Sequence, residues 1–129
     1  MRVFGRFVEM KFAPDMADAI INGIETEDGR TVYKCWTART KPCGRPGDFF
    51  TVRHQAYQIT RIFRARLGEV ADNYEKEGFR SKEEFIERWE QLHPEEGYDP
   101  TMTVWVHEFV PEPKMIVEFF GRPEDGDQI

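Results

Sequence analysis

Residues 33–50 read YKCWTARTKPCGRPGDFF, and this stretch joins two short runs of strand-forming residues through a loop. The segment KPCGRPG supplies the loop, because proline and glycine are residues that turns select. Basic and hydroxyl side chains crowd into the same stretch, namely Lys34, Thr37, Arg39, Lys41 and Arg45. The stretch therefore predicts two strands with positive charge gathered beside them, in a chain whose net charge is −6.

The positive charge is confined to the middle of the chain. Residues 30–66 carry nine basic and one acidic side chain, residues 1–29 carry three and six, and residues 67–129 carry six and seventeen. Because an otherwise acidic surface repels polyanions, such a concentration directs nucleic acid to one place. Alternatively, these cations pair with the acidic helices that follow, and the sequence leaves both interpretations open.

The composition is that of one folded domain. With 129 residues, 40% of them hydrophobic, the chain can bury a single modest core. We expect one domain over residues 1–120 and a flexible polar tail over 121–129. No stretch approaches the roughly 18 consecutive apolar residues of a membrane span, and charges interrupt the N-terminus too often for a signal peptide. These features predict a cytoplasmic protein with no membrane partner, in which Cys35 and Cys43 are free thiols.

Local signals on the N-terminal side of this stretch predict three elements. The alternation of residues 7–12 predicts a strand. A proline followed by apolar residues at helical spacing predicts a helix over 14–22, which Gly23 ends. The Asp-Gly pair at 28–29 then marks a tight hairpin turn between two strands.

On the C-terminal side, residues 48–54 predict one strand and residues 57–67 a second, longer one. The longer strand places Tyr57 and other apolar residues on one side, and Arg61 shares that side. A cation in such a position either reaches past the sheet edge or faces a cleft. The pattern does not decide between the two.

Two helices and two strands follow. Apolar residues at helical spacing over 67–74 predict the first helix, and the capping box Ser81-x-x-Glu84 begins a second that ends at a His-Pro pair. Residues 101–109 alternate like a central strand, and residues 114–120 add a further strand. Strands of this length need closure or cover to protect their edges. The order of elements therefore predicts an α+β protein, a small mixed β-barrel with peripheral helices.

Five blocks follow one another along residues 10 to 109. They are MKFAPDMADAIINGIE, KCWTART, GDFFTV, LGEVADNYEKEGFRSKEEFIERW and VWVHEF. The most specific parts are the cluster Lys34-x-x-Thr37-x-Arg39, the pair Gly47-Asp48, and EGF ahead of a helix that begins Ser-x-x-Glu. Together they resemble an ASCH domain of the PUA-like superfamily. Two features depart from the family. Residues 24–33 lengthen the hairpin, and the sequence leaves open whether the hairpin covers the cleft. The strand at 114–120 is additional.

The resemblance implies binding of RNA or of nucleotides, because members of the family are generally regarded as such binders. Some small bacterial members are amidohydrolases that remove the acetyl group of N4-acetylcytidine. The residues here that match their catalytic set are Lys34, Thr37 and Glu77. By resemblance, Thr37 is the nucleophile, Lys34 the base that activates it, and Glu77 the partner that holds the lysine or manages protons. The implied partner is RNA or a modified pyrimidine nucleoside, with no obligate protein partner.

The chemistry of these residues sets two conditions for such a reaction. A threonine hydroxyl needs a base within hydrogen-bonding reach, and a lysine with a reference pKa of about 10.4 serves only when its pKa is strongly lowered. Arg39 acts in that direction and Glu77 against it, so a structural Lys34–Glu77 salt bridge is the alternative. In a regular strand Lys34 and Thr37 also face opposite sides. A shared site therefore requires a bulge between them.

A binding module makes fewer demands on the same residues. Basic side chains would meet phosphates, and Trp36 or Tyr57 would offer a flat face to an unstacked base. Alternation equally favours a core position for Trp36. The candidate binding residues are Trp36, Arg39, Lys41, Arg45, Arg53, Tyr57 and Arg61.

Other chemistries have weaker support. Cys35 and Cys43 lack the spacing of structural zinc pairs, and the three histidines show no ligand spacing, so we expect no metal. The sequence has no phosphate-cradling glycine loop, so we expect no nucleotide or redox cofactor. A ribonuclease on the same scaffold remains a third possibility, although a good histidine pair is missing.

Overall fold

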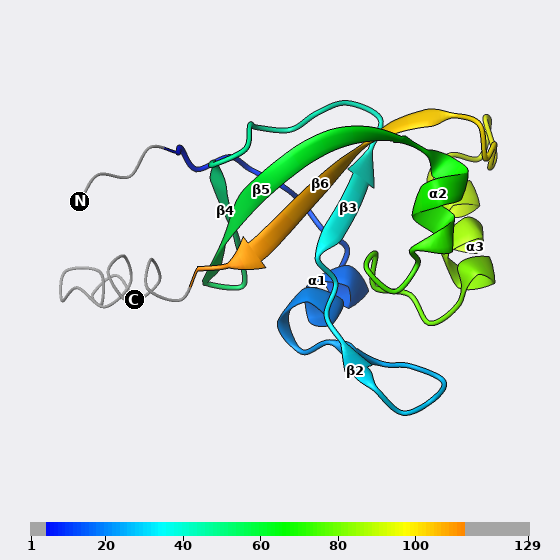
Figure 1. The fold of residues 1–129 in the computed structure, drawn as a ribbon, viewed down its shortest axis with the longest axis horizontal. Coiled ribbons are helices and arrows are strands. Elements are labelled where there is room, and N and C mark those ends of the chain that lie inside the picture. Colours follow the sequence, from blue (N-terminus) through cyan, green and yellow to red (C-terminus); the bar gives the residue numbers. More distant parts are fainter. Residues whose placement is uncertain (1–4, 113–129) are drawn as a thin grey trace, which may run out of the picture.

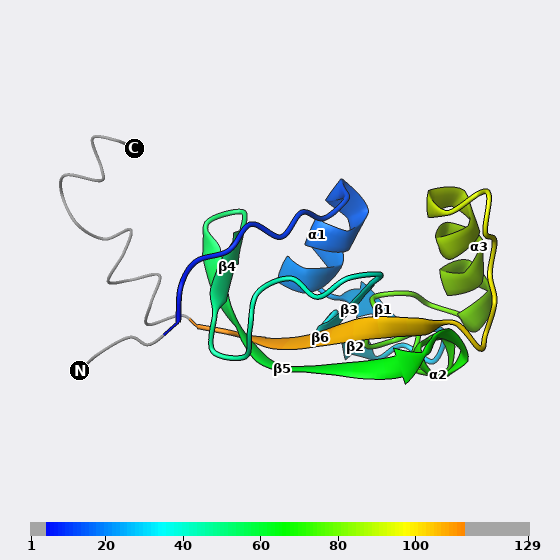
Figure 2. The same ribbon diagram turned by 90° about the horizontal axis from the view of Figure 1, so that it is seen from above.

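The computed structural model describes residues 5–112 and places them in a four-stranded antiparallel sheet, a small hairpin and three helices (Figures 1 and 2). The sheet order is β3-β6-β5-β4, so β6 is interior as expected. The sheet curls into half a barrel, which confirms the α+β class. The predicted strand at 114–120 and the tail at 121–129 lie outside the described residues. The elements are α1 (Pro14–Ile21), β1 (Ile24–Glu25), β2 (Thr31–Val32), β3 (Trp36–Arg39), β4 (Phe49–Val52), β5 (Gln55–Arg66), α2 (Leu67–Asp72), α3 (Lys82–Leu92) and β6 (Thr103–Pro111).

The helix ends follow the local signals. Gly23, with φ +80°, follows α1, and a glycine adopts that backbone conformation at little cost. The Ser81 hydroxyl accepts a 3.1 Å hydrogen bond from the Glu84 backbone amide and begins α3, which His93 ends. The predictions of α1, of the Asp28-Gly29 hairpin and of α3 are therefore confirmed.

The predicted strand at 7–12 is wrong. Phe7 makes a single parallel bridge to Phe49, and the chain then crosses the sheet without a ladder. Its apolar residues of one parity face the interior: Met10 is buried, and the Phe12 ring contacts Phe50 and Phe109, whereas Phe7 is exposed. Alternation reports which residues are buried, and an extended segment without strand partners produces the same pattern.

The predicted strand at 48–54 is wrong at its end, because Arg53 and His54 form the turn between β4 and β5. Both have positive φ values, 49° and 74°. Such turns usually contain glycine or asparagine, and this one contains neither. The sequence therefore carried no signal for it.

The long strand β5 is interrupted by a bulge that places Arg61 on the opposite side of the sheet from Tyr57. Register with β6 shifts between Ile59 and Arg61, so two residues of β5 lie opposite Glu108. The Arg61 guanidinium donates a 2.6 Å hydrogen bond to the Glu108 carboxylate, and the Arg61 side chain is 56% exposed. The expectation that Arg61 shares the apolar side of Tyr57 is thus wrong, because the extra residue reverses the alternation.

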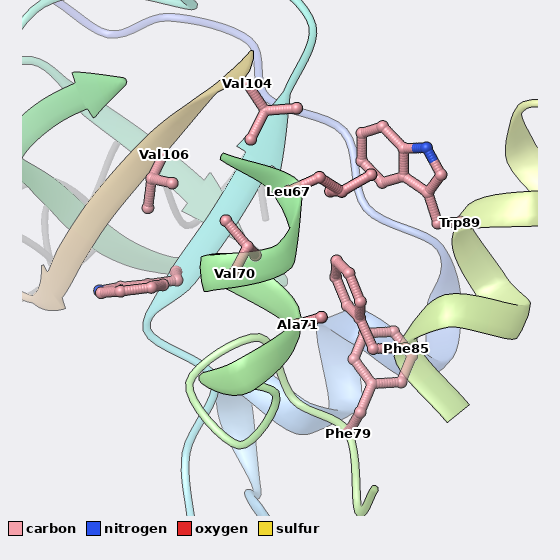
Figure 3. Close-up of a cluster of buried hydrophobic side chains, with 9 residues drawn as sticks. Leu67, Val70, Ala71, Phe79, Phe85, Trp89, Val104 and Val106 are labelled. Atoms are coloured by element: carbon pink, nitrogen blue, oxygen red, sulfur yellow. The ribbon is translucent and has the colours of Figure 1, made fainter. Parts of the chain in front are cut away.

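Two hydrophobic clusters hold the sheet to its helices. The first joins α2 and α3 to β3 and β6 (Figure 3), and the second packs the N-terminal segment and α1 on β4, β5 and β6. The first cluster consists of Trp36, Leu67, Val70, Ala71, Phe79, Phe85, Trp89, Val104 and Val106. The second consists of Met10, Ala17, Ile20, Phe50, Val52, Tyr57, Ile59 and Phe109.

Candidate functional site

A pocket of about 590 Å³ lies between α1, α3 and β3. Figure 2 shows these two helices on the same side of the sheet, α1 over its middle and α3 toward one end. Phe12, Phe79, Phe85 and Trp89 give the pocket aromatic walls. Among the lining residues that the structure describes, Glu77 is acidic and the basic ones are Lys11, Lys34, Arg39, Lys41 and Arg88. The pocket is therefore apolar in its walls and positive in its charge.

Lys34 enters the pocket from the segment between β2 and β3. Its backbone amide donates to the Ala19 carbonyl of α1, at 3.1 Å. Its ammonium group donates to the carbonyls of Trp36 and Glu77, at 2.8 and 2.7 Å, and lies 3.4 Å from Glu77 Oε1. Three acceptors match the three donors of a charged lysine. This lysine is therefore held in one position.

The irregularity that a shared site requires lies between Lys34 and Thr37. The backbone amides of Cys35 and Trp36 both donate to the Lys76 carbonyl, at 2.9 and 3.0 Å, where a regular ladder would alternate its partners. As a result Lys34 and Thr37 line the same pocket despite their opposite parity. The chain fold thus removes the geometric objection to a common site.

Glu77 reaches Lys34 because the next residue is glycine. Gly78 has φ +94°, and a Cβ built on it would meet the Ala19 Cβ at 3.1 Å and the Lys34 side chain at 3.2 Å. A larger residue would both strain the backbone and displace the lysine stem. Phe79 then anchors the segment in the first hydrophobic cluster. The EGF sequence therefore has a physical role: it places a carboxylate against Lys34.

Burial weakens the charge on both partners. Burial lowers the pKa of Lys34, and the attraction of Glu77 only partly opposes this effect. Burial likewise raises the pKa of Glu77 against the attraction of Lys34. Both residues are 4% exposed. The pair is therefore displaced toward its neutral form, in which lysine could act as a base.

Thr37 is bound to Arg39 rather than to the lysine. The Arg39 Nε–H donates a 3.0 Å hydrogen bond to Thr37 Oγ1, and Arg39 also donates to the Lys11 carbonyl. Within residues 5–112, the Lys34 ammonium donates no hydrogen bond to Thr37. The three residues of the implied catalytic set therefore share a pocket without the contact that proton transfer needs.

Two residues that line this pocket each have a buried polar atom without a hydrogen-bond partner. In the described part of the chain, the buried side-chain nitrogen and oxygen atoms in this condition are Glu77 Oε2 and Trp89 Nε1. Figure 3 shows the Trp89 nitrogen on the side of its ring away from Leu67. Both residues line the pocket. One acceptor and one donor are thus available to a ligand. Leaving such a buried group unpaired costs about 1–3 kcal/mol of stability.

His107 fixes the loop at the pocket rim. Its Nε2 accepts a 2.8 Å hydrogen bond from the Cys43 backbone amide, so its Nδ1 carries the proton that is shared with the Thr37 carbonyl at 3.2 Å. The residue is fully buried, and burial lowers its pKa. His107 therefore holds the 40–47 loop against β3 as a neutral ring.

No family model and no curated protein sequence matches the chain. The structure is similar to the crystal structure of an ASCH domain from Lactobacillus crispatus JV V101, with a TM-score of 0.53 and 14% sequence identity. The superposition covers 83% of this chain and 79% of that one. The fold is that of an ASCH domain. The expected ASCH architecture is thereby confirmed, whereas identity at this level carries no information on activity.

On this ASCH fold the predicted binding residues are dispersed. Arg39 and Lys41 line the pocket, whereas the Arg45 side chain is exposed on the loop beyond it. Arg53 pairs with Asp18 of α1, and Arg61 pairs with Glu108. Most of the basic block is therefore spread over separate surfaces.

The two aromatic candidates lie in the core. Trp36 is 6% exposed, donates from its indole nitrogen to Glu108 at 2.9 Å and packs edge-on against Phe63. Tyr57 is 5% exposed and stacks on Phe50. The core position that alternation favours for Trp36 is confirmed. The aromatic walls of the pocket come from other residues.

Several pocket residues were not among the predicted ones. Lys11 and Arg88 lie outside the basic block, and Trp89 reads as an ordinary core residue of an amphipathic helix. Arg88 also pairs with Asp15, which ties α3 to α1. The helical spacing of Phe85, Trp89 and Leu92 was the available signal, and it does not separate a core face from a pocket wall.

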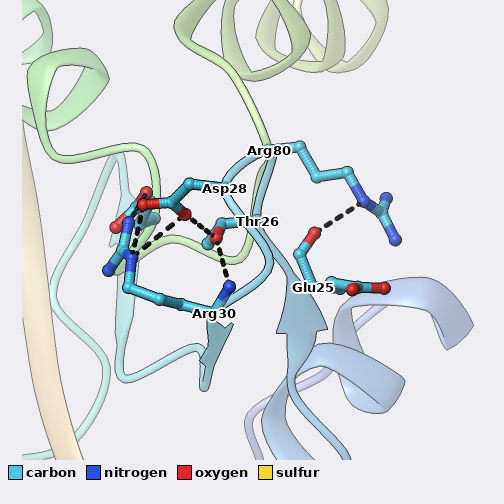
Figure 4. A network of polar contacts seen from close by, with 6 residues as sticks. Glu25, Thr26, Asp28, Arg30 and Arg80 are labelled. Atoms are coloured by element: carbon cyan, nitrogen blue, oxygen red, sulfur yellow. Dashed lines mark hydrogen bonds and ion pairs between the residues drawn. The ribbon is translucent and has the colours of Figure 1, made fainter.

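The lengthened hairpin of the ASCH fold lies away from the pocket. Figure 4 shows Thr26, Asp28 and Arg30 joined within the hairpin, and Arg80 donating to the Glu25 carbonyl at 3.2 Å. Arg30 also reaches Glu75 at 3.1 Å. None of residues 24–33 lines the pocket. The hairpin is thus fastened to the 75–80 segment and does not cover the site.

The remaining chemistry concerns metals, thiols and membranes. Over residues 5–112 no group of three or more His, Cys, Asp or Glu side chains could hold a metal ion. Cys35 and Cys43 are free thiols, as predicted. None of the described helices is long and apolar enough to cross a bilayer.

Proposed function

We propose that the protein recognises a pyrimidine nucleoside unit, free or within RNA, in the pocket between α1 and α3. The observation that carries this proposal is that two residues lining one aromatic pocket each carry an unpaired buried polar atom, the acceptor Glu77 Oε2 and the donor Trp89 Nε1. A pyrimidine such as cytosine offers the matching groups, an amino group and a ring carbonyl. Ligand pockets of this size typically enclose one small molecule.

The charge of the pocket supports the same ligand. Lys11, Lys41 and Arg88 surround it, while the charge of Glu77 is largely balanced by Lys34. A ribose phosphate attached to the base would meet these cations. The resemblance of the sequence to ASCH domains, generally regarded as binders of RNA or nucleotides, supports this assignment as well.

Amide hydrolysis is the second candidate, favoured by the shared pocket of Lys34, Thr37 and Glu77. Thr37 Oγ1 would attack the acetyl carbonyl of N4-acetylcytidine and pass its proton to neutral Lys34. Lys34 would return the proton to the departing N4 amine, and water would then release acetate from the threonine ester. The lowered pKa of Lys34 fits this role. The lysine must also turn from a backbone carbonyl toward Thr37, because its hydrogen bonds are otherwise used.

The binding proposal is tested with Trp89→Phe, which keeps an aromatic ring at this position and removes the indole N–H. We expect the affinity for cytidine 5′-monophosphate, measured by calorimetry, to fall about 5-fold to 20-fold, the effect of one lost buried hydrogen bond. Arg53→Ala is the matched control, because Arg53 pairs with Asp18 away from the pocket. Unchanged affinity in Trp89→Phe, or no binding by the intact protein, would contradict the proposal.

The catalytic candidate has a separate test. The protein is incubated with N4-acetylcytidine, and cytidine release is followed by chromatography beside Lys34→Ala and Thr37→Ala. Release that both variants abolish would support hydrolysis. Binding of the nucleoside without release from the intact protein would exclude this substrate and leave recognition as the function.

A further inference from the structure

Three side chains from three adjacent strands form a row that begins at the pocket. Arg39 of β3 lies directly opposite Trp105 of β6, and Trp105 lies directly opposite Arg64 of β5. Cross-strand partners point to the same side of a sheet. The Arg64 guanidinium lies 5.5 Å from the centre of the Trp105 ring, within cation–π range. We call Arg39, Trp105 and Arg64 the Trp105 row.

On this side of the sheet, among residues 5–112, the cross-strand neighbours of the row carry no carboxylate, and Glu77 of the pocket acts on its Arg39 end. The neighbouring cross-strand sets are Arg66 with Thr103, and Ile62 with His107 and Thr37. The opposite side differs, because there Arg61 is neutralised by Glu108, which also accepts from Trp36. The same strand β5 therefore presents a neutralised arginine on one side and, among the described ion pairs, unneutralised Arg64 on the other.

The row continues the positive lining of the pocket. Arg39 belongs to both, since it lines the pocket and stands at the end of the row. Lys41 follows two residues later in the loop that His107 holds against the sheet. Neighbouring strands lie about 4.8 Å apart, so the path from β3 to β5 extends roughly 10 Å from the pocket wall. Arg64 at its far end is exposed, and Trp105 is half-buried.

We propose that the Trp105 row binds the nucleotide next to the pocket in a single strand of RNA. Arg64 would meet its phosphate, and Trp105 would contact its sugar or base, the combination of cation and aromatic that holds single strands. The inference rests on the proposed function for the nucleoside in the pocket and adds the substrate class: an oligonucleotide rather than a free nucleoside.

The test compares cytidine 5′-monophosphate with a hexacytidylate RNA on the intact protein, Arg64→Ala and Arg61→Ala. We expect the hexamer to bind at least tenfold tighter than the monophosphate. Arg64→Ala should weaken hexamer binding about fivefold and reduce its salt slope by about 0.7, the value for one lost phosphate contact on a single strand. Its monophosphate affinity should not change. Arg61→Ala, the matched control, should behave as the intact protein.

The outcomes separate this inference from the pocket proposal. Equal hexamer affinity and salt slope in Arg64→Ala and the intact protein would overturn the role of the row, whether or not the monophosphate binds. Monophosphate binding without tighter hexamer binding would overturn it as well, and the pocket would stand. Hexamer binding that depends on Arg64 in a protein that fails to bind the monophosphate would support the row and refute the pocket.

Discussion

Two ion pairs whose basic members, Arg30 and Lys34, are four residues apart have similar chemistry and opposite surroundings. Lys34 and Glu77 are each 4% exposed in the pocket. Arg30 and Asp28 lie at the hairpin, where their side chains are 55% and 65% exposed. Each pair joins a basic side chain to a carboxylate, and each connects with the segment before α3, since Arg30 also reaches Glu75.

These surroundings shift the pKa values of the two carboxylates in opposite directions. Burial raises the pKa of Glu77, whereas hydrogen bonds from the Thr26 hydroxyl and then from Arg30 lower the pKa of Asp28 to about 2. The pKa values of the inner pair are therefore shifted toward each other, whereas the shift at Asp28 favours the charged form of the outer pair. The hairpin pair therefore fixes a turn, whereas the pocket pair has the shifted pKa values that acid–base chemistry needs.

The largest expected effect comes from breaking the inner pair. Glu77→Leu leaves Lys34 buried without its carboxylate, and we expect a loss of about 3–5 kcal/mol in the free energy of unfolding. Urea denaturation at pH 7, followed by tryptophan fluorescence, measures it. A variant as stable as the intact protein would mean that the pair contributes nothing to the fold.

A double variant shows whether this loss comes from the unpaired lysine or from lost packing. Lys34→Met together with Glu77→Leu replaces both charges by apolar groups, and such replacements are often neutral or stabilising. We therefore expect most of the lost stability to return. If the double variant is no more stable than Glu77→Leu alone, the loss comes from packing and not from an unpaired lysine.

Replacing His107, a buried group without an ion pair, should cause a loss of stability smaller than that of Glu77→Leu. His107→Leu removes hydrogen bonds to the Cys43 amide and the Thr37 carbonyl, and we expect about 2 kcal/mol of lost stability at pH 7. Burial, helped by Arg39, lowers its pKa below the ordinary value of 6.5. The unfolded state therefore takes up the proton first as the pH falls.

The pH profile checks the sign of this effect. The contribution of His107 should be complete above about pH 6.5 and be lost as the pH falls through the lower folded-state pKa. The variant His107→Leu should lose less stability than the intact protein as the pH falls, because it lacks this titrating group. The other titrating groups are the same in both proteins and contribute equally. Parallel stability curves between pH 7 and 5 would contradict a neutral buried His107.

The sequence predicted the elements whose signals are local. Gly23 and the Asp28-Gly29 pair mark turns through their own backbone preferences, and Ser81 caps α3 by accepting from the Glu84 amide three residues later. The failures are non-local. Whether residues 7–12 form a ladder depends on a partner strand, and the bulge before Arg61 depends on the register with β6.

The candidate site was accessible to sequence reasoning only in part. Lys34, Thr37 and Glu77 came from a family resemblance, and the structure brings them into one pocket, while their roles stay predictions. Charge counting marked Arg53 and Arg61 as strongly as Arg39, because it cannot tell which cations meet a carboxylate in the fold. Trp89 was missed since its unpaired nitrogen is visible only in three dimensions.

The smallest expected effect comes from the outer pair. Arg30→Ala removes contacts to Asp28 and Glu75 that are exposed to solvent, where salt and water screen them. We expect the urea midpoint and the affinity for cytidine 5′-monophosphate to match those of the intact protein, because none of residues 24–33 lines the pocket. A clear loss of affinity at unchanged stability would show that the hairpin acts on the pocket through the 75–80 segment, and the inner and outer pairs would then have to be treated as one coupled network.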